Sequence, residues 1–326
     1  MEEDMKPTNL ARKFTGLLAG AVMALAGGIA SADDYPSKPI SLIVPFGAGG
    51  GSDTSARIYQ KTFQDNDLLG QPLTVFNVPG AGGSVGARQV KDADPDGYTF
   101  LLIHMALLTR QGAGLIDFGY QDFELVAGTE VNNSVLVVRK DSPYQTLADL
   151  VEGAKANPDT IVFGVNMGAN KHMEGLLIEE HAGVDFRFAQ IGGDAKNVTA
   201  LQGGHIDVTS LSIGSFTKLG EDFRALAIYS AERRDGVDIP TFKEQGYDIT
   251  YTVQNWWFAP KDTPQQAIDH FAAALKAAGE TKYAMEAFAG RNSKTVFSSG
   301  QEFADLVAAA YTQVKPLAQI AAQKTQ

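Results

Sequence analysis

Two glycine-rich loops near the start of the chain could bind an anion through their backbone N–H groups. Phe46–Asp53 and Pro79–Ser84 each follow an expected strand and lead into an expected helix. Glycine lets the backbone approach a partner closely, and a helix N-terminus offers free N–H groups and the positive end of a dipole. The pair therefore predicts an anion site in one crevice at the carboxyl ends of neighbouring strands. The plainer alternative is a tight turn in which Ser52 or Asp53 only caps a helix.

The candidate ligand-binding residues of this crevice come from both loops and from the third expected strand. The first loop contributes Phe46, Gly47, Ala48, Gly49, Gly50, Ser52 and Asp53. The second loop contributes Pro79, Gly80, Ala81, Gly82, Gly83 and Ser84. His104 ends the third expected strand and should therefore face the same crevice.

The spacing of residues in the two loops does not match nucleotide-binding motifs, and it weakly suggests a catalytic serine. Neither loop carries the Gly-Lys-Ser/Thr of a P-loop or the G-x-G-x-x-G of a dinucleotide fold. Gly82–Gly86 matches G-x-S-x-G, and Asp207 and His270 could complete a triad with Ser84. Ser84 follows its strand at too great a distance for a nucleophile elbow, so a chance match is favoured. An exported serine hydrolase using Ser84 stays an alternative.

The amino-acid composition excludes several classes of ligand and of catalytic site. The 326 residues carry a formal net charge of −11 and contain no Cys. An acidic chain without a basic run is a poor partner for a nucleic-acid backbone. Without Cys there are no disulfides, thiol nucleophiles or iron–sulfur clusters. No cofactor or metal is expected.

The first segment has the features of a secretory signal peptide. Basic residues between Lys6 and Lys13 precede an apolar run from Phe14 to Ile29, and Ala30-Ser31-Ala32 gives a small-x-small cleavage pattern. The apolar run contains glycines and falls short of the roughly 20 residues that a membrane span needs. We expect cleavage after Ala32, which would remove residues 1–32 and leave a periplasmic protein.

The elements that must position these loops alternate as in an α/β fold. Expected strands at Ile40–Phe46, Leu73–Asn77 and Thr99–Ile103 enclose expected helices at Ser55–Gln64 and Val85–Lys91. A second alternation follows residue 147, and three helical patterns end the chain.

No linker separates the two halves, so we expect the chain to cross between two lobes near 128–134 and 250–256. The region 123–139 carries two apolar runs broken by Glu130–Asn133. The last three helices are expected to pack back on the first lobe.

The combination of these segments resembles a known family. The matching segments are Tyr35–Ile40, Ile43–Asp53, Asn77–Gly86, Asp96–Thr99, Gly203–Asp207, Ile239–Phe242, Gly246–Tyr247 and Trp257–Pro260. They are similar to segments of the tripartite tricarboxylate transporter solute-binding proteins, the Bug family. The resemblance runs from about Tyr35 to the C-terminus.

This resemblance implies a two-lobed periplasmic-binding-protein fold of type II, a Venus flytrap in which helices flank a mixed sheet in each lobe. It implies one lobe from 33–130 and 255–326 and a second lobe from 131–254. It also implies a monomer that is not an enzyme. Such a protein captures a small organic carboxylate by hinge closure and delivers it to the membrane permease subunits of the transporter. A sensor that presents the carboxylate to a membrane receptor is the alternative role.

The resemblance also implies a division of labour in the site. The two glycine-rich loops would hold one carboxylate through backbone groups and ordered water. The second lobe would supply the distal contacts, from Asn166, Met167, Ala169, Lys171, Gly192, Gly193, Asp194 and Ser212. Val78 stands where the family often has Arg, so Lys171 is either the replacement charge that pairs with a distal carboxylate or a solvated lysine.

The sequence leaves the ligand open among dicarboxylates, tricarboxylates, aromatic acids and acidic amino acids, with a dicarboxylate preferred. Trp256 and Trp257 could stack on an aromatic acid or could simply pack near a lobe crossing.

Overall fold

The computed structural model describes residues 35–234 and 236–324. Contacts group Lys38–Gln326 into one compact unit, to which the following description refers. The expected signal peptide, residues 1–32, lies outside the described residues. No helix among the described residues is both long enough and apolar enough to span a bilayer.

The first lobe is built on three parallel strands. β1 (Ile40–Val44) lies between β2 (Leu73–Asn77) and β3 (Thr99–Ile103). α2 (Gly51–Asn66) connects β1 to β2, and α3 (Ser84–Lys91) connects β2 to β3. The expected alternation of strands and helices is confirmed here, and the carboxyl ends of β1 and β2 carry the two glycine-rich loops.

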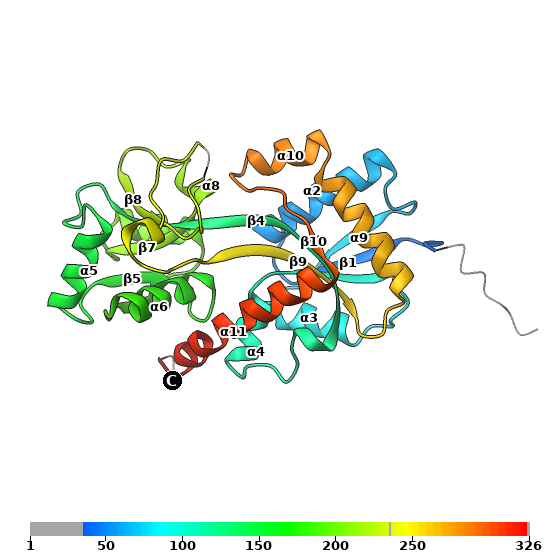
Figure 1. Cartoon of the computed structure of the whole chain (residues 1–326), viewed down its shortest axis with the longest axis horizontal. Coiled ribbons are helices and arrows are strands. Elements are labelled where there is room, and N and C mark those ends of the chain that lie inside the picture. The colour runs from blue at the N-terminus through cyan, green and yellow to red at the C-terminus, as the bar shows by residue number, and fades with distance from the viewer. Residues whose placement is uncertain (1–34, 235, 325–326) are drawn as a thin grey trace, which may run out of the picture. The chain divides into compact units, whose positions relative to one another are not determined.

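Two long strands join the lobes. β4 (Phe123–Arg139) and β9 (Thr252–Pro260) pair antiparallel and run side by side between the two groups of helices (Figure 1). β4 is one strand of 17 residues and continues through Glu130–Asn133, where the polar residues break the apolar pattern but not the strand. The pairing of β4 with β9 shifts register between Gly128 and Val131, which carries the strand through this polar stretch.

The second lobe repeats the α/β pattern. Its elements are α5 (Leu147–Ala156), β5 (Val162–Val165), α6 (Asn170–Ala182), β6 (Arg187–Gln190), α7 (Asp194–Gln202), β7 (Val208–Ser212), α8 (Ile213–Phe216) and β8 (Phe223–Ile228). The path through both lobes is β2-β1-β3-β9-β4-β7-β5-β6, with β8 and the short β10 (Ser298–Ser299) also pairing with β4. The expected mixed sheet with flanking helices in each lobe is confirmed.

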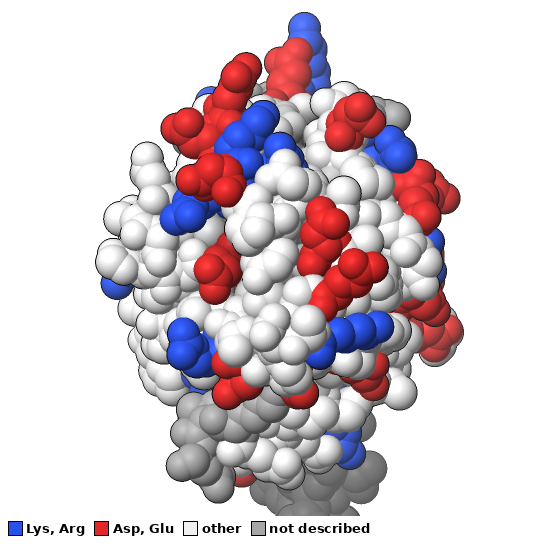
Figure 2. All heavy atoms as spheres, turned by 90° about the vertical axis from the view of Figure 1, so that its left-hand side faces the viewer, with Lys and Arg blue, Asp and Glu red and all other residues white. Residues whose placement is uncertain are grey.

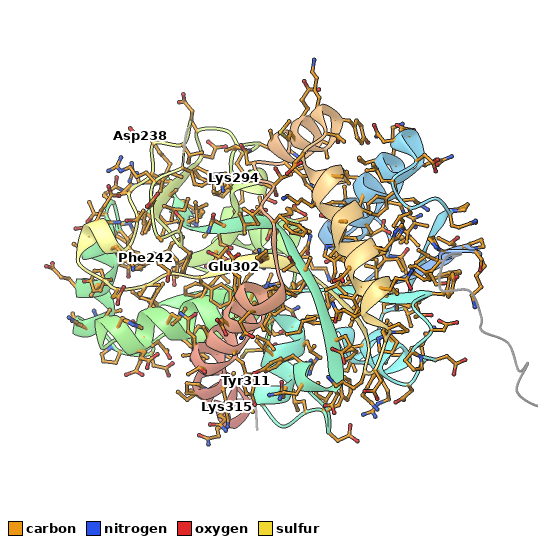
Figure 3. The ribbon with its side chains drawn as sticks, turned by 45° about the vertical axis from the view of Figure 1, so that its right-hand side comes forward. Asp238, Phe242, Lys294, Glu302, Tyr311 and Lys315 are labelled. Atoms are coloured by element: carbon orange, nitrogen blue, oxygen red, sulfur yellow. The ribbon has the colours of Figure 1, made fainter. Side chains whose placement is uncertain are left out.

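The remaining elements complete the two lobes. The helices are α4 (Ala106–Gly112), α9 (Gln265–Gly279), α10 (Lys282–Ala289) and α11 (Gly300–Lys324), with short 3₁₀ turns at Ala81–Gly83, Tyr120–Asp122 and Lys243–Gln245. α9 and α10 pack on α2, as expected. α11 packs on α4 of the first lobe and also on α6 of the second. Figure 3 labels Glu302, Tyr311 and Lys315 along α11.

One buried apolar cluster runs under both lobes. It includes Leu101 and Trp256 on the first-lobe side and Leu136 and Phe163 on the second. The expected boundaries at 130/131 and 254/255 fall within β4 and β9, and this division into lobes stays a prediction.

The outer end of the second lobe carries charges of both signs. Figure 2 shows acidic and basic side chains interspersed over this face rather than gathered by sign. This face therefore offers no stripe of Lys and Arg of the kind that binds a nucleic-acid backbone.

Candidate functional site

A cleft lies where β4 and β9 pass between the lobes. It consists of two cavities of about 300 and 240 Å³, which share Asn132 of β4 and Val253 of β9. The first-lobe cavity is also lined by Phe46, Gly51, Ser52, Ser55, His104, Glu130, Asn255 and Arg291. The second-lobe cavity is also lined by Ser134, Asn166, Ala169, Asn170, Lys171, Glu174, Gly192, Gly193, Asp194 and Ser212.

The N-terminus of α2 opens into the first-lobe cavity without a side-chain cap. The N-cap residue is Gly50, and within the described residues this helix start has no side-chain cap hydrogen bond. The alternative in which Ser52 or Asp53 acts as the N-cap is therefore not supported. The first-turn N–H groups have no acceptor within the helix, so they stay available to an anion at the place where Gly51 and Ser52 line the cavity.

Asp53 braces the first glycine-rich loop instead of capping the helix. Its carboxylate accepts the N–H of Gly49 at 2.8 Å and the side-chain amide of Asn77 at 3.0 Å, and Arg57 forms an ion pair with it at 3.2 Å. Burial alone would raise the pKa of Asp53, but these partners outweigh burial and lower it. Asn77 also donates to the carbonyl of Phe46, so the end of β2 helps to hold the loop in place.

Arg291 brings a positive charge to the same helix end, and the sequence analysis missed it. Its guanidinium donates to Oγ of Ser55 at 3.0 Å and to the carbonyl of Gly51 at 3.2 Å. It also lies 3.9 Å from Oε1 of Glu130. The buried Glu130 carboxylate accepts hydrogen bonds from Ser55 at 2.5 Å and from Asn255 at 2.7 Å. The Arg291 side chain is 26% exposed, so its charge can still reach a ligand in the cavity.

His104 lines the cavity in its neutral form. Its ring stacks on Phe46 with centroids 4.8 Å apart, and burial lowers its pKa to about 4. Nδ1 accepts the N–H of Ala106 at 3.3 Å, which leaves the proton on Nε2. At neutral pH His104 can therefore give a ligand one hydrogen bond but no positive charge.

The second glycine-rich loop does not line either cavity of the cleft. A Cβ added to Gly83 would lie 3.3 Å from the ring of Phe46, so this loop packs closely against the ring. Six further residues that were expected to contact the ligand also lie outside the two cavity linings, namely Gly47, Ala48, Gly49, Gly50, Asp53 and Met167. Their part in ligand binding stays a prediction.

Lys171 is ion-paired within the second-lobe wall. Its ammonium lies 2.5 Å from Oδ1 of Asp194 and also donates to the carbonyl of Ser210. Asp194 accepts further hydrogen bonds from the N–H and hydroxyl of Ser212. Burial would raise the pKa of Asp194, but Lys171 and the neighbouring hydroxyls outweigh burial and lower it. The positive charge of Lys171 is therefore balanced by a carboxylate of the chain itself.

Glu174 is a second site residue that the sequence analysis missed. It lies on α6 one turn after Lys171, lines the second-lobe cavity, and is 0% exposed. Neither of its carboxyl oxygens completes a hydrogen bond within the described part of the chain. Burial raises its pKa, and this effect is only partly offset by Lys171 and by the hydroxyls of Ser134 and Ser210.

The two tryptophans pack inside the protein rather than lining the cleft. Trp256 and Trp257 are 1% and 0% exposed, and their indole N–H groups bond to Gln254 and Thr129. Trp256 borders a different cavity, of about 510 Å³, which α11 also lines. The packing alternative is therefore supported over stacking on an aromatic ligand.

The three residues of the hydrolase alternative have separate partners. Ser84 donates to the carbonyl of Ala81, Asp207 accepts the N–H of Val162, and His270 bonds to the carbonyl of Leu69. No interaction among the three is seen in the described residues, so the geometry gives the triad no support. Likewise, the described residues form no group of three or more His, Asp or Glu side chains that could hold a metal.

Comparison with known proteins gives a consistent result. A family model described as "Tripartite tricarboxylate transporter family receptor" matches residues 56–322. A relative from Agrobacterium vitis, described as a UPF0065 protein in the TAR-I ttuE-ttuC' intergenic region, is 35% identical over 264 residues. This match covers 79% of this chain and 76% of the relative.

Solved structures agree with these matches. A TctC solute-binding protein from Polaromonas has a TM-score of 0.76 at 28% identity, covering 87% of this chain and 98% of that one. MatC from Rhodopseudomonas palustris, solved with bound malate, has a TM-score of 0.72 at 25% identity, covering 87% of this chain and 100% of that one. The family inferred from the sequence is thus confirmed.

Proposed function

Because the chain belongs to the tripartite tricarboxylate transporter receptor family, we propose that it captures a small organic carboxylate in the cleft between its lobes. Members of this family are periplasmic solute-binding proteins. We further infer that this chain is exported by its N-terminal segment and works as a monomer. It would deliver its ligand to the membrane permease subunits of the transporter.

The observation that carries this proposal is the uncapped N-terminus of α2 beside Arg291. Free N–H groups at a helix N-terminus bind carboxylates, and the helix dipole favours the negative charge. The guanidinium adds a positive charge next to the same N–H groups. A chain of net charge −11 repels anions at long range, so capture must depend on such short-range donors.

The relatives support a carboxylate as the class of ligand, but they do not identify which carboxylate this chain binds. MatC holds malate in its structure, and its fold matches the present one along nearly its whole length. The neutral Nε2–H of His104 and the amide of Asn255, both in the first-lobe cavity, can contribute further hydrogen bonds to a carboxylate.

A thermal-shift screen tests the proposal. Ligand-free protein is heated with monocarboxylates, dicarboxylates, tricarboxylates, aromatic acids and amino acids in turn. A ligand at 100 times its Kd stabilises the folded state by about 2.7 kcal/mol, which raises Tm by a few degrees. We expect a selective shift with one carboxylate class. No shift with any carboxylate would contradict the proposal.

A further inference from the structure

The charges along the cleft are distributed unevenly. The first-lobe end offers an anion the N-terminus of α2 and the guanidinium of Arg291. Glu130 also lines this end, 3.9 Å from Arg291, but its carboxylate already accepts hydrogen bonds from Ser55 and Asn255. The second-lobe end contains one cation, Lys171, and two carboxyl groups, Asp194 and Glu174. Since Lys171 and Asp194 form an ion pair, no unbalanced positive charge remains at this end for a second ligand carboxylate.

Three buried acceptor atoms on two side chains at the second-lobe end have no partner in hydrogen-bonding geometry among the described residues, although the hydroxyls of Ser134 and Ser210 lie close enough to Glu174 to lower its pKa. They are the carboxyl oxygens of Glu174 and Oδ1 of Asn132, and both side chains line this cavity. A buried acceptor without a donor is costly, so such groups usually meet a ligand or water. An acceptor-rich pocket with a spare carboxyl group is suited to a group that brings both N–H donors and positive charge.

Two helices begin at this end of the cleft, α6 after Ala169 and α7 after Gly193, and neither has a side-chain cap within the described residues. Their positive dipole ends would favour an anion. The carboxylate of Asp194 pairs with Lys171 in the first turn of α6, so one negative charge of the chain already contacts the first turns of both helices. Because Lys171 is paired with Asp194, a ligand carboxylate placed here would meet the carboxyl group of Glu174, and a negative charge on that group would oppose it.

From this distribution we propose that the second-lobe end of the cleft accepts a cationic end group, with Glu174 as its counter-ion. The inference rests on the proposed function, because the other end of the ligand is the carboxylate held at α2. The ligand is then a small ω-amino acid, with a carboxylate at one end and an ammonium at the other. Glu174 and Asn132 accept its N–H groups, and Lys171 keeps Asp194 neutralised.

Pairs of compounds that differ only at one end provide the test. Calorimetric titration compares 4-aminobutanoate with succinate, 5-aminopentanoate with glutarate, and 6-aminohexanoate with adipate. Within each pair the chain length and the first carboxylate are the same, and only the far end changes sign. We expect the ω-amino acid to bind more tightly than the dicarboxylate by about 10- to 100-fold in at least one pair, the range for a hydrogen bond to a charged group.

Glu174→Gln identifies the residue responsible. Glutamine keeps the shape but cannot balance an ammonium, so we expect this variant to lose the preference for the ω-amino acid. Glu180→Gln changes an exposed residue of the same helix and should keep it. Retained preference in Glu174→Gln, with an unchanged Glu180→Gln control, would overturn the role of Glu174.

The outcomes separate this inference from the proposed function. Tighter binding of the dicarboxylate in every pair overturns the inference and leaves carboxylate capture standing. If no compound of either series binds, the inference is also overturned, and the wider carboxylate screen then decides about the proposed function independently.

Discussion

The ammonium of Lys171 lies 2.5 Å from Oδ1 of Asp194, and this ion pair ties the start of α6 to the start of α7. The side chains are 13% and 29% exposed, so the pair is shielded from solvent on most sides. The sequence left this lysine as either the replacement for a missing ligand-binding charge or a solvated lysine at a helix start. In the structure its charge is balanced within the wall of the cleft.

A double-mutant cycle measures this pair. Lys171→Met leaves the carboxylate of Asp194 without its cation and should lower the free energy of unfolding by about 1–3 kcal/mol. Asp194→Asn in the same chain removes the stranded charge and should recover much of the loss. Chemical denaturation of the single and double variants gives the coupling energy. Additive losses would show that the two side chains stabilise the fold independently.

Glu174→Gln should stabilise the ligand-free protein at neutral pH. Burial raises the folded-state pKa of Glu174, so the unfolded chain releases this proton at a lower pH than the folded chain. Wild-type stability is therefore lost as pH rises from the unfolded value, about 4.3, towards the raised folded value. Glutamine does not titrate. Denaturation curves should show that the free energy of unfolding of the variant increases relative to wild type as pH rises over this range. A difference that does not change with pH would contradict the claim that burial raises the pKa of Glu174.

His104 should make the protein less stable as pH falls, which is the opposite of the pH dependence expected from Glu174. Its pKa is lowered to about 4 in the folded state and is about 6.5 when unfolded, so the unfolded chain binds this proton first as pH falls. The contribution is fully present above a pH of about 6.5 and is lost as pH falls towards 4, by about 3 kcal/mol. His104→Gln should lose less stability over this window in denaturation experiments. An identical pH profile would show that His104 titrates normally.

Contacts between the loop after α10 and the second lobe should support closure. Asn292 donates to Oγ1 of Thr217 at 2.7 Å, and Arg234 donates to the carbonyl of Asn292 at 3.1 Å. A Cβ added to Gly214 would overlap the carbonyl oxygen of Arg291.

Gly214→Ala should therefore keep the lobes apart and weaken ligand binding by about tenfold or more, if roughly 1.4 kcal/mol of closure energy is lost. Gly220→Ala is the matched control, because nothing lies within 4 Å of a Cβ at Gly220. Equal affinities in the two variants, measured by titration with the ligand found in the screen, would rule out this contact as part of closure.

The sequence predicted those parts of the site that are formed by residues close together in the chain. The glycine run before Ser52 marks the N-terminus of α2, and this prediction needed only a strand, a loop and a helix in succession. Arg291 reaches Gly51 across 240 positions, and Asn255 reaches Glu130 across 125. No local pattern can reveal such pairs, because the topology of β4, β9 and the last helices brings them together.

The sequence does not show the surroundings of a polar residue. Glu130–Asn133 break the apolar pattern of the region 123–139, yet β4 continues through them because the cleft accepts polar side chains from this stretch. Nothing in the local sequence singles out Glu174, and only the packing of the second lobe shows that it is buried. Pro79–Ser84 has the composition of a ligand loop and contacts Phe46 through Gly83, and its part in ligand binding stays a prediction.

The most direct test of the account is the affinity of Arg291→Gln for the carboxylate found in the screen. Arg291 supplies the positive charge beside the N-terminus of α2, so its removal should weaken binding by about 10- to 100-fold in a calorimetric titration. Arg187→Gln, at an exposed arginine of β6, should bind like wild type. Unchanged affinity in Arg291→Gln would contradict the claim that this cleft captures its carboxylate at the N-terminus of α2.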